Sequence, residues 1–275
     1  MHLKDILVYL DDGVSNVERV KAAFALAKSH KARLTGVTLA SVKPAHLKVK
    51  NTKALKRISE QQAEERAAEF SELAKNEGIS VDTRVVHGEE DVAARKMAQF
   101  SRNFDLVMLR QANPNKDNFS IIKEVSEQVI MLSGRPVFFM PYIGAHRMPC
   151  KKAMIAWDGP PAATRAVHDA IPLLSQMDKV IVLVVRQGKK KTAKGELMVD
   201  FTVNHLKRHK VKAKVKRINA GTFDVPTVLL NEIAENDIDL LVMGGYGKPS
   251  IRQKFFGGVT RTLLSSMIVP VLMSH

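Results

Sequence analysis

Short apolar runs alternate with longer amphipathic stretches along the whole chain. The run Ile6–Leu10 is followed by a helical pattern, and the run Ala153–Ala156 is followed by another. Strands that alternate with helices in this way predict a parallel sheet covered by helices on both faces. We expect strands near 4–10, 33–40, 81–86, 105–110 and 136–140 in the first half, and near 151–157, 179–186, 211–218, 239–243 and 269–273 in the second.

Helices of 12 to 25 residues are expected between these strands. The longest is predicted over Lys53–Asn76. Gly78 stands just past its end, where a glycine typically terminates a helix. Ser15 and Glu18 have the spacing of a capping box and predict the start of the first helix.

The two halves carry the same landmarks in the same order. Asp105–Met108 matches Asp239–Met243, and Arg135–Phe138 matches Val269–Leu272, both at an offset of 134 residues. Landmarks repeated at a fixed period indicate a duplicated structural unit. The segment Pro141–Cys150 has little periodicity and links the copies. We therefore predict two tandem α/β domains, 1–143 and 150–275.

Composition fits a reducing, cytoplasmic setting. Hydrophobic residues make up 45% of the chain and aromatic residues only 5%, which suits buried parallel strands. A single cysteine, Cys150, excludes a disulfide-stapled secreted protein. The chain runs straight into a strand pattern without a signal peptide. Apolar runs such as Val180–Val185 are far shorter than the roughly 20 residues of a membrane span, so we expect no membrane partner.

The net charge of +15 raises the question of an acidic partner. The strand pattern Lys210–Ile218 alternates lysine with apolar residues, which is typical of a guarded sheet edge. No recognition helix, zinc spacing or aromatic-interleaved basic groove accompanies the charge, so we do not expect nucleic acid to bind. An interaction scaffold with a basic surface remains an alternative function.

A glycine-rich stretch in the second half carries the candidate chemistry. Gly244 and Gly247 follow a predicted strand, and Gly257 and Gly258 open a predicted helix. A helix start presents unpaired N–H groups to an anion, and glycines let that anion approach the backbone. Asp158 ends another strand and is expected at the same rim, where it could accept hydrogen bonds from a sugar or a base. Neither the Walker A spacing nor a clean GxGxxG is present.

The spacing Gly244-x-x-Gly247-x9-Gly257-Gly258 resembles the ATP-binding signature of the universal stress protein family. Ala156–Gly159, Asp239–Met243 and Val269–Val271 also resemble that family. The resemblance implies two tandem five-stranded parallel sheets of order 3-2-1-4-5, Rossmann-like, in a cytoplasmic stress-response protein. It also implies that the halves meet through their last strands and that a homodimer is one assembly to test.

The resemblance implies a role for each matching residue. The ligand would be ATP or another adenine nucleotide, ADP or AMP, with or without Mg. Gly258 departs from the family, which usually has Ser or Thr there, and Thr260 is a candidate replacement hydroxyl. The implied contacts are Asp158 to the adenosine moiety, Val185 to the adenine edge through its backbone, Met243 to the adenine pocket, Gly244 and Gly247 to ribose and phosphates, and Gly257 and Gly258 to the phosphates through N–H groups.

The first half keeps Asp11 but loses the glycines. The offset of 134 places Arg110, Asn113, Lys123 and Glu124 at the four glycine positions. These side chains would fill the space that phosphates need, so we expect no nucleotide to bind there in this way.

Structural alternatives stand beside the functional ones. The glycines could form a tight loop without a ligand, and Asp158 could cap the next helix. His205 and His209 have a zinc-compatible i, i+4 spacing without an evident third ligand, so a solvated face is expected. Lys189–Lys191 could be a solvated loop or a lid over phosphates. No nucleophile or general base emerges, so at most weak ATP hydrolysis is expected.

Overall fold

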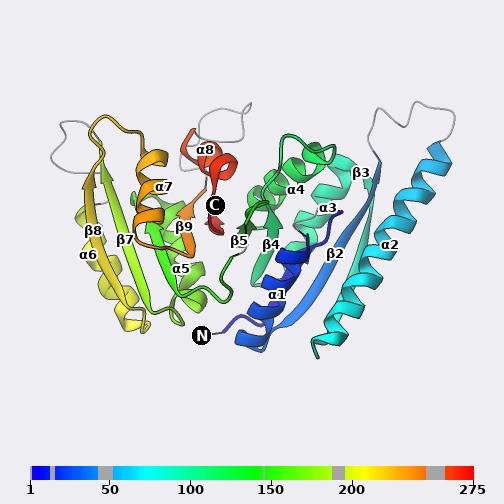
Figure 1. The fold of residues 1–275 in the computed structure, drawn as a ribbon, viewed down its shortest axis with the longest axis horizontal. Coiled ribbons are helices and arrows are strands. Elements are labelled where there is room, and N and C mark those ends of the chain that lie inside the picture. Colours follow the sequence, from blue (N-terminus) through cyan, green and yellow to red (C-terminus); the bar gives the residue numbers. More distant parts are fainter. Residues whose placement is uncertain (1, 13–15, 43–51, 145, 188–195, 246–257) are drawn as a thin grey trace. The chain divides into compact units, whose positions relative to one another are not determined.

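The computed structural model describes the chain except for residues 1, 13–15, 43–51, 145, 188–195 and 246–257 (Figure 1). The chain divides into two compact units, His2–Val137 and Phe138–His275. The capping-box residue Ser15, the Lys189–Lys191 run, Gly247 and Gly257 lie outside the described residues. The domain limits expected from the sequence, 1–143 and 150–275, stay a prediction.

Each half follows the predicted alternation of strand and helix. The first half contains β1 (Asp5–Tyr9), α1 (Asn16–His30), β2 (Arg33–Val42), α2 (Thr52–Asn76), β3 (Val81–Glu89), α3 (Glu90–Ser101), β4 (Leu106–Arg110), α4 (Phe119–Leu132) and β5 (Val137–Met140). The second contains β6 (Lys152–Ala156), α5 (Pro161–Leu174), β7 (Lys179–Arg186), α6 (Glu196–Arg208), β8 (Ala213–Asn219), α7 (Val225–Glu235), β9 (Leu240–Gly244), α8 (Gly258–Ser266) and β10 (Val271–Ser274).

Helix lengths differ from expectation at one end of the range. The longest helix, α2, has 25 residues, and Gly78 beyond it adopts a φ of 68°, which favours glycine. Two helices are shorter than the predicted minimum, because α7 has 11 residues and α8 has 9.

The strand order places the first strand of each half in the interior of its sheet. In the first unit the order is β3-β2-β1-β4, and Val107 of β4 donates its N–H to the carbonyl of Pro136, just before β5 (3.1 Å). In the second unit it is β10-β9-β6-β7-β8, which reads 3-2-1-4-5 from the β8 end when the strands are numbered within the half. β1 pairs in parallel with β2 and β4, and β6 pairs in parallel with β7 and β9.

One carboxylate fixes the start of each half in the same way. Asp105 Oδ2 accepts the backbone N–H groups of Lys4 (2.7 Å) and Asp5 (3.1 Å). Asp239 Oδ2 accepts those of Lys151 (2.8 Å) and Lys152 (2.9 Å). The repeat is therefore visible in hydrogen bonds as well as in sequence.

Helices cover both faces of each sheet. In the first unit, α1 and α2 share a face, because Phe24 and Phe70 stack with ring centroids 5.7 Å apart, while α3 packs against α4. In the second unit, α5 and α6 share a face through His168 and His205, while α7 packs against α8. The inner strands such as β1, β4 and β9 are almost wholly buried and apolar, as parallel strands are, whereas β3 and β8 are partly exposed.

Candidate nucleotide site

Three of the predicted nucleotide contacts, Asp158, Val185 and Met243, lie at or just beyond the carboxyl ends of neighbouring strands in the second unit. Ala156 of β6 pairs with Met243 of β9 on one side and with Leu183 of β7 on the other. Asp158 lies two residues after Ala156, and Val185 lies two residues after Leu183, so both lie towards the carboxyl ends of their strands. The strand order reverses at β6, because β7 lies on one side of it and β9 on the other. Ligands of open parallel sheets bind at such a switch point.

Gly244 has a packing reason to be glycine. A Cβ built on it would lie 2.5 Å from the backbone nitrogen of Ala163 and 2.7 Å from the carbonyl carbon of Ala162, both in α5. No larger residue fits unless the backbone moves. This contact supports the structural explanation for Gly244, and it leaves the strand end tight against the start of α5.

Asp158 stands in a turn built around Gly159. Gly159 has a φ of 90°, which favours glycine. The N-cap position of α5 belongs to Pro160, which makes no side-chain capping hydrogen bond, so Asp158 is not the N-cap residue of α5. The side chain of Asp158 is exposed, in contrast to the buried apolar positions that precede it.

The remaining predicted ligands differ in accessibility. Val185 is half-buried, whereas Met243 is buried and belongs to the core of β9. Beyond Met243 the turn is held by the N–H of Gly245, which donates to the carbonyl of Ser274 at 2.8 Å. The hydroxyl of Ser274 donates to Asp169 of α5 at 2.7 Å, so β10, α5 and this turn are tied together.

At the start of α8, Gly258 is exposed and Thr260 is buried. A Cβ built on Gly258 meets nothing within 4 Å, so the position has room for a side chain. Thr260 instead lies on the inner side of α8. For the predicted contact, the Thr260 hydroxyl would have to reach a phosphate from this buried position. The contact stays a prediction.

The first unit fills the equivalent place with arginine. Asp11 is buried, and it pairs with Arg19 of α1 (Nη2–Oδ1, 3.0 Å) and with Arg110 of β4 (Nε–Oδ2). Both guanidinium groups are almost completely buried. Two cations therefore enclose one carboxylate, in the position where the second unit has an exposed carboxylate.

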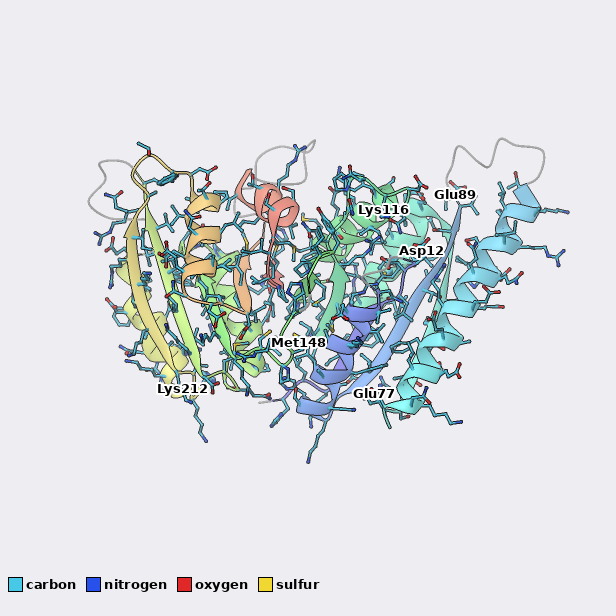
Figure 2. The ribbon with its side chains drawn as sticks, viewed as in Figure 1. Asp12, Glu77, Glu89, Lys116, Met148 and Lys212 are labelled. Atoms are coloured by element: carbon cyan, nitrogen blue, oxygen red, sulfur yellow. The ribbon has the colours of Figure 1, made fainter. Side chains whose placement is uncertain are left out.

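A wider network holds both arginines in place. Arg19 Nε donates to the carbonyl of Tyr9 at 2.8 Å. Arg110 Nη2 donates to Asn118 Oδ1 at 2.8 Å, and Asn118 Nδ2 donates to Asp12 Oδ1 at 2.7 Å. Asp12, labelled in Figure 2, lies immediately after Asp11. Burial and the nearby Asp11 carboxylate raise the pKa of Tyr9 well above its usual range.

Strand register identifies what the second unit has instead of these arginines. Ile6 faces Leu106 as Ala153 faces Leu240, so the first strands match at an offset of 147 residues and the fourth strands at 134. Arg110 then corresponds to Gly244, and Arg19 to Ala166, which is fully buried in α5. Sequence comparison found the first replacement but missed the second. The signal was available, since Arg19 and Ala166 each stand eight residues after their aspartate.

Other candidates have structural explanations. Burial raises the pKa of the Cys150 thiol to about 12, so it is a protonated core residue rather than a nucleophile. The basic strand β8 lies at the sheet edge, and two of its charges are paired, Lys216 with Glu232 (2.6 Å) and Arg217 with Asp200 (3.3 Å). Lys212, labelled in Figure 2, and Lys214 are exposed. Among the described residues, no helix has the length and apolarity needed to cross a membrane.

Comparison with known proteins gives one family. The family model described as "Universal stress protein family" matches residues 2–141 and again residues 149–275. No curated protein sequence matches the chain significantly.

Two solved structures share the fold over nearly the whole chain. A universal stress protein from Archaeoglobus fulgidus DSM 4304 is 16% identical with a TM-score of 0.75, over 98% of this chain and 95% of that one. A putative universal stress protein from Pseudomonas aeruginosa UCBPP-PA14 is 12% identical with a TM-score of 0.63, over 99% and 93%. A universal stress protein solved in complex with cAMP is 18% identical with a TM-score of 0.38, over 53% and 99%.

Proposed function

Because the chain belongs to the universal stress protein family, we propose that its second half binds one adenine nucleotide and that its first half does not. The observation that carries the proposal is the contrast between the two aspartates. Asp158 is exposed at the switch point of its sheet, whereas Asp11 is buried between two arginines. An exposed carboxylate at that edge can accept hydrogen bonds from ribose hydroxyls or a base amine.

The loss of both arginines agrees with this assignment. The second half has Ala166 and Gly244 where the first half has Arg19 and Arg110, so no cation covers the carboxylate from those positions. The ligand would be ATP, ADP or AMP, with or without Mg. Val185 and Met243 would contact the adenine, and Gly244, Gly247, Gly257 and Gly258 would approach the ribose and phosphates, with Thr260 as a further hydroxyl.

Calorimetric titration of the full chain with ATP, ADP and AMP tests the proposal. We expect one site per chain, and we expect Asp158→Ala to weaken binding by roughly tenfold or more, because a hydrogen bond to a charged group contributes about 1.5–3 kcal/mol. Asp178→Ala is the matched control, since Asp178 is also exposed but precedes β7 at the opposite edge of the sheet. Binding that Asp158→Ala leaves intact, or an absence of heat at millimolar nucleotide, would contradict the proposal.

Phosphate release measured in the same samples addresses weak ATP hydrolysis. We expect binding without turnover. Release that disappears with Asp158→Ala and persists with Asp178→Ala would instead assign a slow ATPase to this site.

A basic interaction scaffold is tested separately. It predicts binding to an acidic polymer that weakens steeply with salt and that Lys212→Ala and Lys214→Ala reduce. Nucleotide binding that these two substitutions leave unchanged would keep the two functions apart.

A further inference from the structure

Three histidines gather on one face of the second unit. His168 belongs to α5, His205 belongs to the last turn of α6, and His209 directly follows α6. The ring centroids of His168 and His205 are 4.7 Å apart, and those of His205 and His209 are 4.6 Å apart. Sequence spacing identified only the pair His205 and His209. The fold brings the third imidazole to it from 37 positions earlier in the chain.

His205, in the middle of the cluster, has an unsatisfied ring nitrogen. Its Nε2 atom is buried and has no hydrogen-bond partner in the described part of the chain. A buried polar atom left unpaired costs about 1–3 kcal/mol, so such an atom calls for an explanation.

We propose that His168, His205 and His209 bind one divalent transition-metal ion of the zinc class. Neutral imidazole nitrogens are preferred ligands of Zn²⁺, Ni²⁺ and Co²⁺. His205 in the last turn of α6 and His209 four residues later, with a third ligand from α5, give three protein ligands, which leaves a fourth position to water. The ion would satisfy the buried Nε2 of His205.

Ring rotation is required for this coordination. In the described residues, no three His, Cys, Asp or Glu side chains already stand in a metal-holding arrangement. His168 and His209 are both exposed, so their rings have room to turn towards His205. Zn–N bonds are about 2.0–2.1 Å long, and rings bound to one ion have centroids about 5 Å apart, close to the present spacing.

Metal binding would link α5 to α6 and stabilise the second unit. An ion that binds only the folded state raises its stability in proportion to the logarithm of the ion concentration over Kd. The site does not depend on the proposed nucleotide site, because its ligands lie on the outer helices rather than at the carboxyl edge of the sheet.

Calorimetric titration of the chelator-treated full chain with Zn²⁺, without nucleotide, tests the proposal. We expect one ion per chain. Loss of a side chain that only hydrogen-bonds to a metal ligand weakens metal binding roughly 10–100-fold. Loss of a ligand itself should cost more, so we expect a larger effect from each of His168→Ala, His205→Ala and His209→Ala. His87→Ala is the matched control, because His87 is an exposed histidine of the first unit. Co²⁺ should give the absorption bands of a tetrahedral site in the wild type and in His87→Ala, and not in the three site variants.

Two outcomes would overturn the site. Absence of saturable binding is one. The other is binding that survives His168→Ala yet disappears with His209→Ala, because that pattern belongs to a surface chelate of His205 and His209 alone. His168→Gln, which keeps size and polarity, replaces His168→Ala if the alanine variant loses the circular dichroism of the folded protein. Hydrogen exchange of α5 and α6 should slow with Zn²⁺ in the wild type and not in the His168 variant.

Discussion

The two halves of the chain have the same skeleton but place the aspartate after their first strand in opposite environments. Asp11 lies between Arg19 and Arg110 and is shielded from solvent. Asp158 is exposed, next to an edge where Ala166 and Gly244 stand at the corresponding positions. Two substitutions on neighbouring elements thus decide whether a carboxylate belongs to the core or faces solvent.

The physical basis of the contrast is volume and charge together. An arginine side chain is long enough to cross from α1 or β4 to Asp11, and its charge offsets the cost of burying the carboxylate. Alanine and glycine supply neither bulk nor charge. A carboxylate beside them stays exposed to solvent.

Removing each aspartate is the strongest test of this comparison. We expect Asp11→Ala to destabilise the first unit by about 3–5 kcal/mol, because it leaves two buried guanidinium groups without their carboxylate. Asp158→Ala should change the stability of the second unit by no more than about 0.5 kcal/mol, as exposed positions usually do. Hydrogen exchange resolved by peptide measures both units in one experiment.

The reverse pattern would break the comparison. If Asp158→Ala proved as destabilising as Asp11→Ala, then Asp158 would be a structural residue and the nucleotide assignment would lose its main support. Asp178→Ala gives the background for an exposed aspartate of the same unit.

The second test concerns the glycine that replaces Arg110. We expect Gly244→Ala to destabilise the second unit by about 3 kcal/mol, since the added Cβ would lie 2.5 Å from a backbone atom of α5 and overpacking typically costs 1–3 kcal/mol. Urea unfolding followed by Trp157 fluorescence measures this, because Trp157, the single tryptophan of the sequence, lies in the second unit.

Gly258→Ala is the matched control for that substitution. Its new Cβ meets nothing within 4 Å, so the unfolding midpoint should stay near that of the wild type. Equal midpoints for the two variants would show that the strand end tolerates a side chain, and that Gly244 is not required for packing.

The sequence predicted most of the fold, because the fold depends on periodicity. Buried parallel strands and the glycine after α2 have strong local patterns, and the offset of 134 residues near the end of each half identified Arg110 as the counterpart of Gly244. The role of Arg19 could not be predicted in this way. A single arginine on an amphipathic helix usually points to solvent, and only the packing of α1 beside β4 turns it towards Asp11.

The same limit applies to the histidines. His205 and His209 are close in sequence, whereas His168 reaches them only because α5 and α6 cover the same face of the sheet. The short length of α8 was also missed, since helical periodicity does not determine where a helix begins after a glycine-rich connection.

Acid should separate the halves by a smaller amount. Burial, together with His2, lowers the pKa of His30 to about 4, and His30 Nδ1 is positioned to accept the N–H of Leu3 (3.4 Å), which requires a neutral ring. Below pH 6.5 the unfolded chain takes up a proton that the folded ring resists. The stability of the first unit should therefore fall by about 2 kcal/mol as pH drops from 6.5 to about 4.

His30→Met is the matched variant, because the second unit has the buried residue Met177 at the corresponding place, 147 positions later. It should flatten the pH dependence in urea unfolding followed by circular dichroism. An unchanged pH slope in this variant would assign the acid sensitivity to other groups.

The smallest expected effect concerns Gly258, the first residue of α8. We expect Gly258→Ser to tighten nucleotide binding by roughly tenfold, because a new hydroxyl could donate a hydrogen bond to a phosphate worth about 1.5 kcal/mol. The position is exposed and has open space, so the fold should not resist the change.

Gly258→Ala separates the hydroxyl from the added carbon, and calorimetry with ATP and AMP separates the phosphates from the adenosine. A gain for ATP but not AMP, present with serine and absent with alanine, would place the outer phosphates beside the start of α8. An equal gain for both nucleotides would place the residue near the part of the ligand that they share, and unchanged affinity would remove Gly258 from the site.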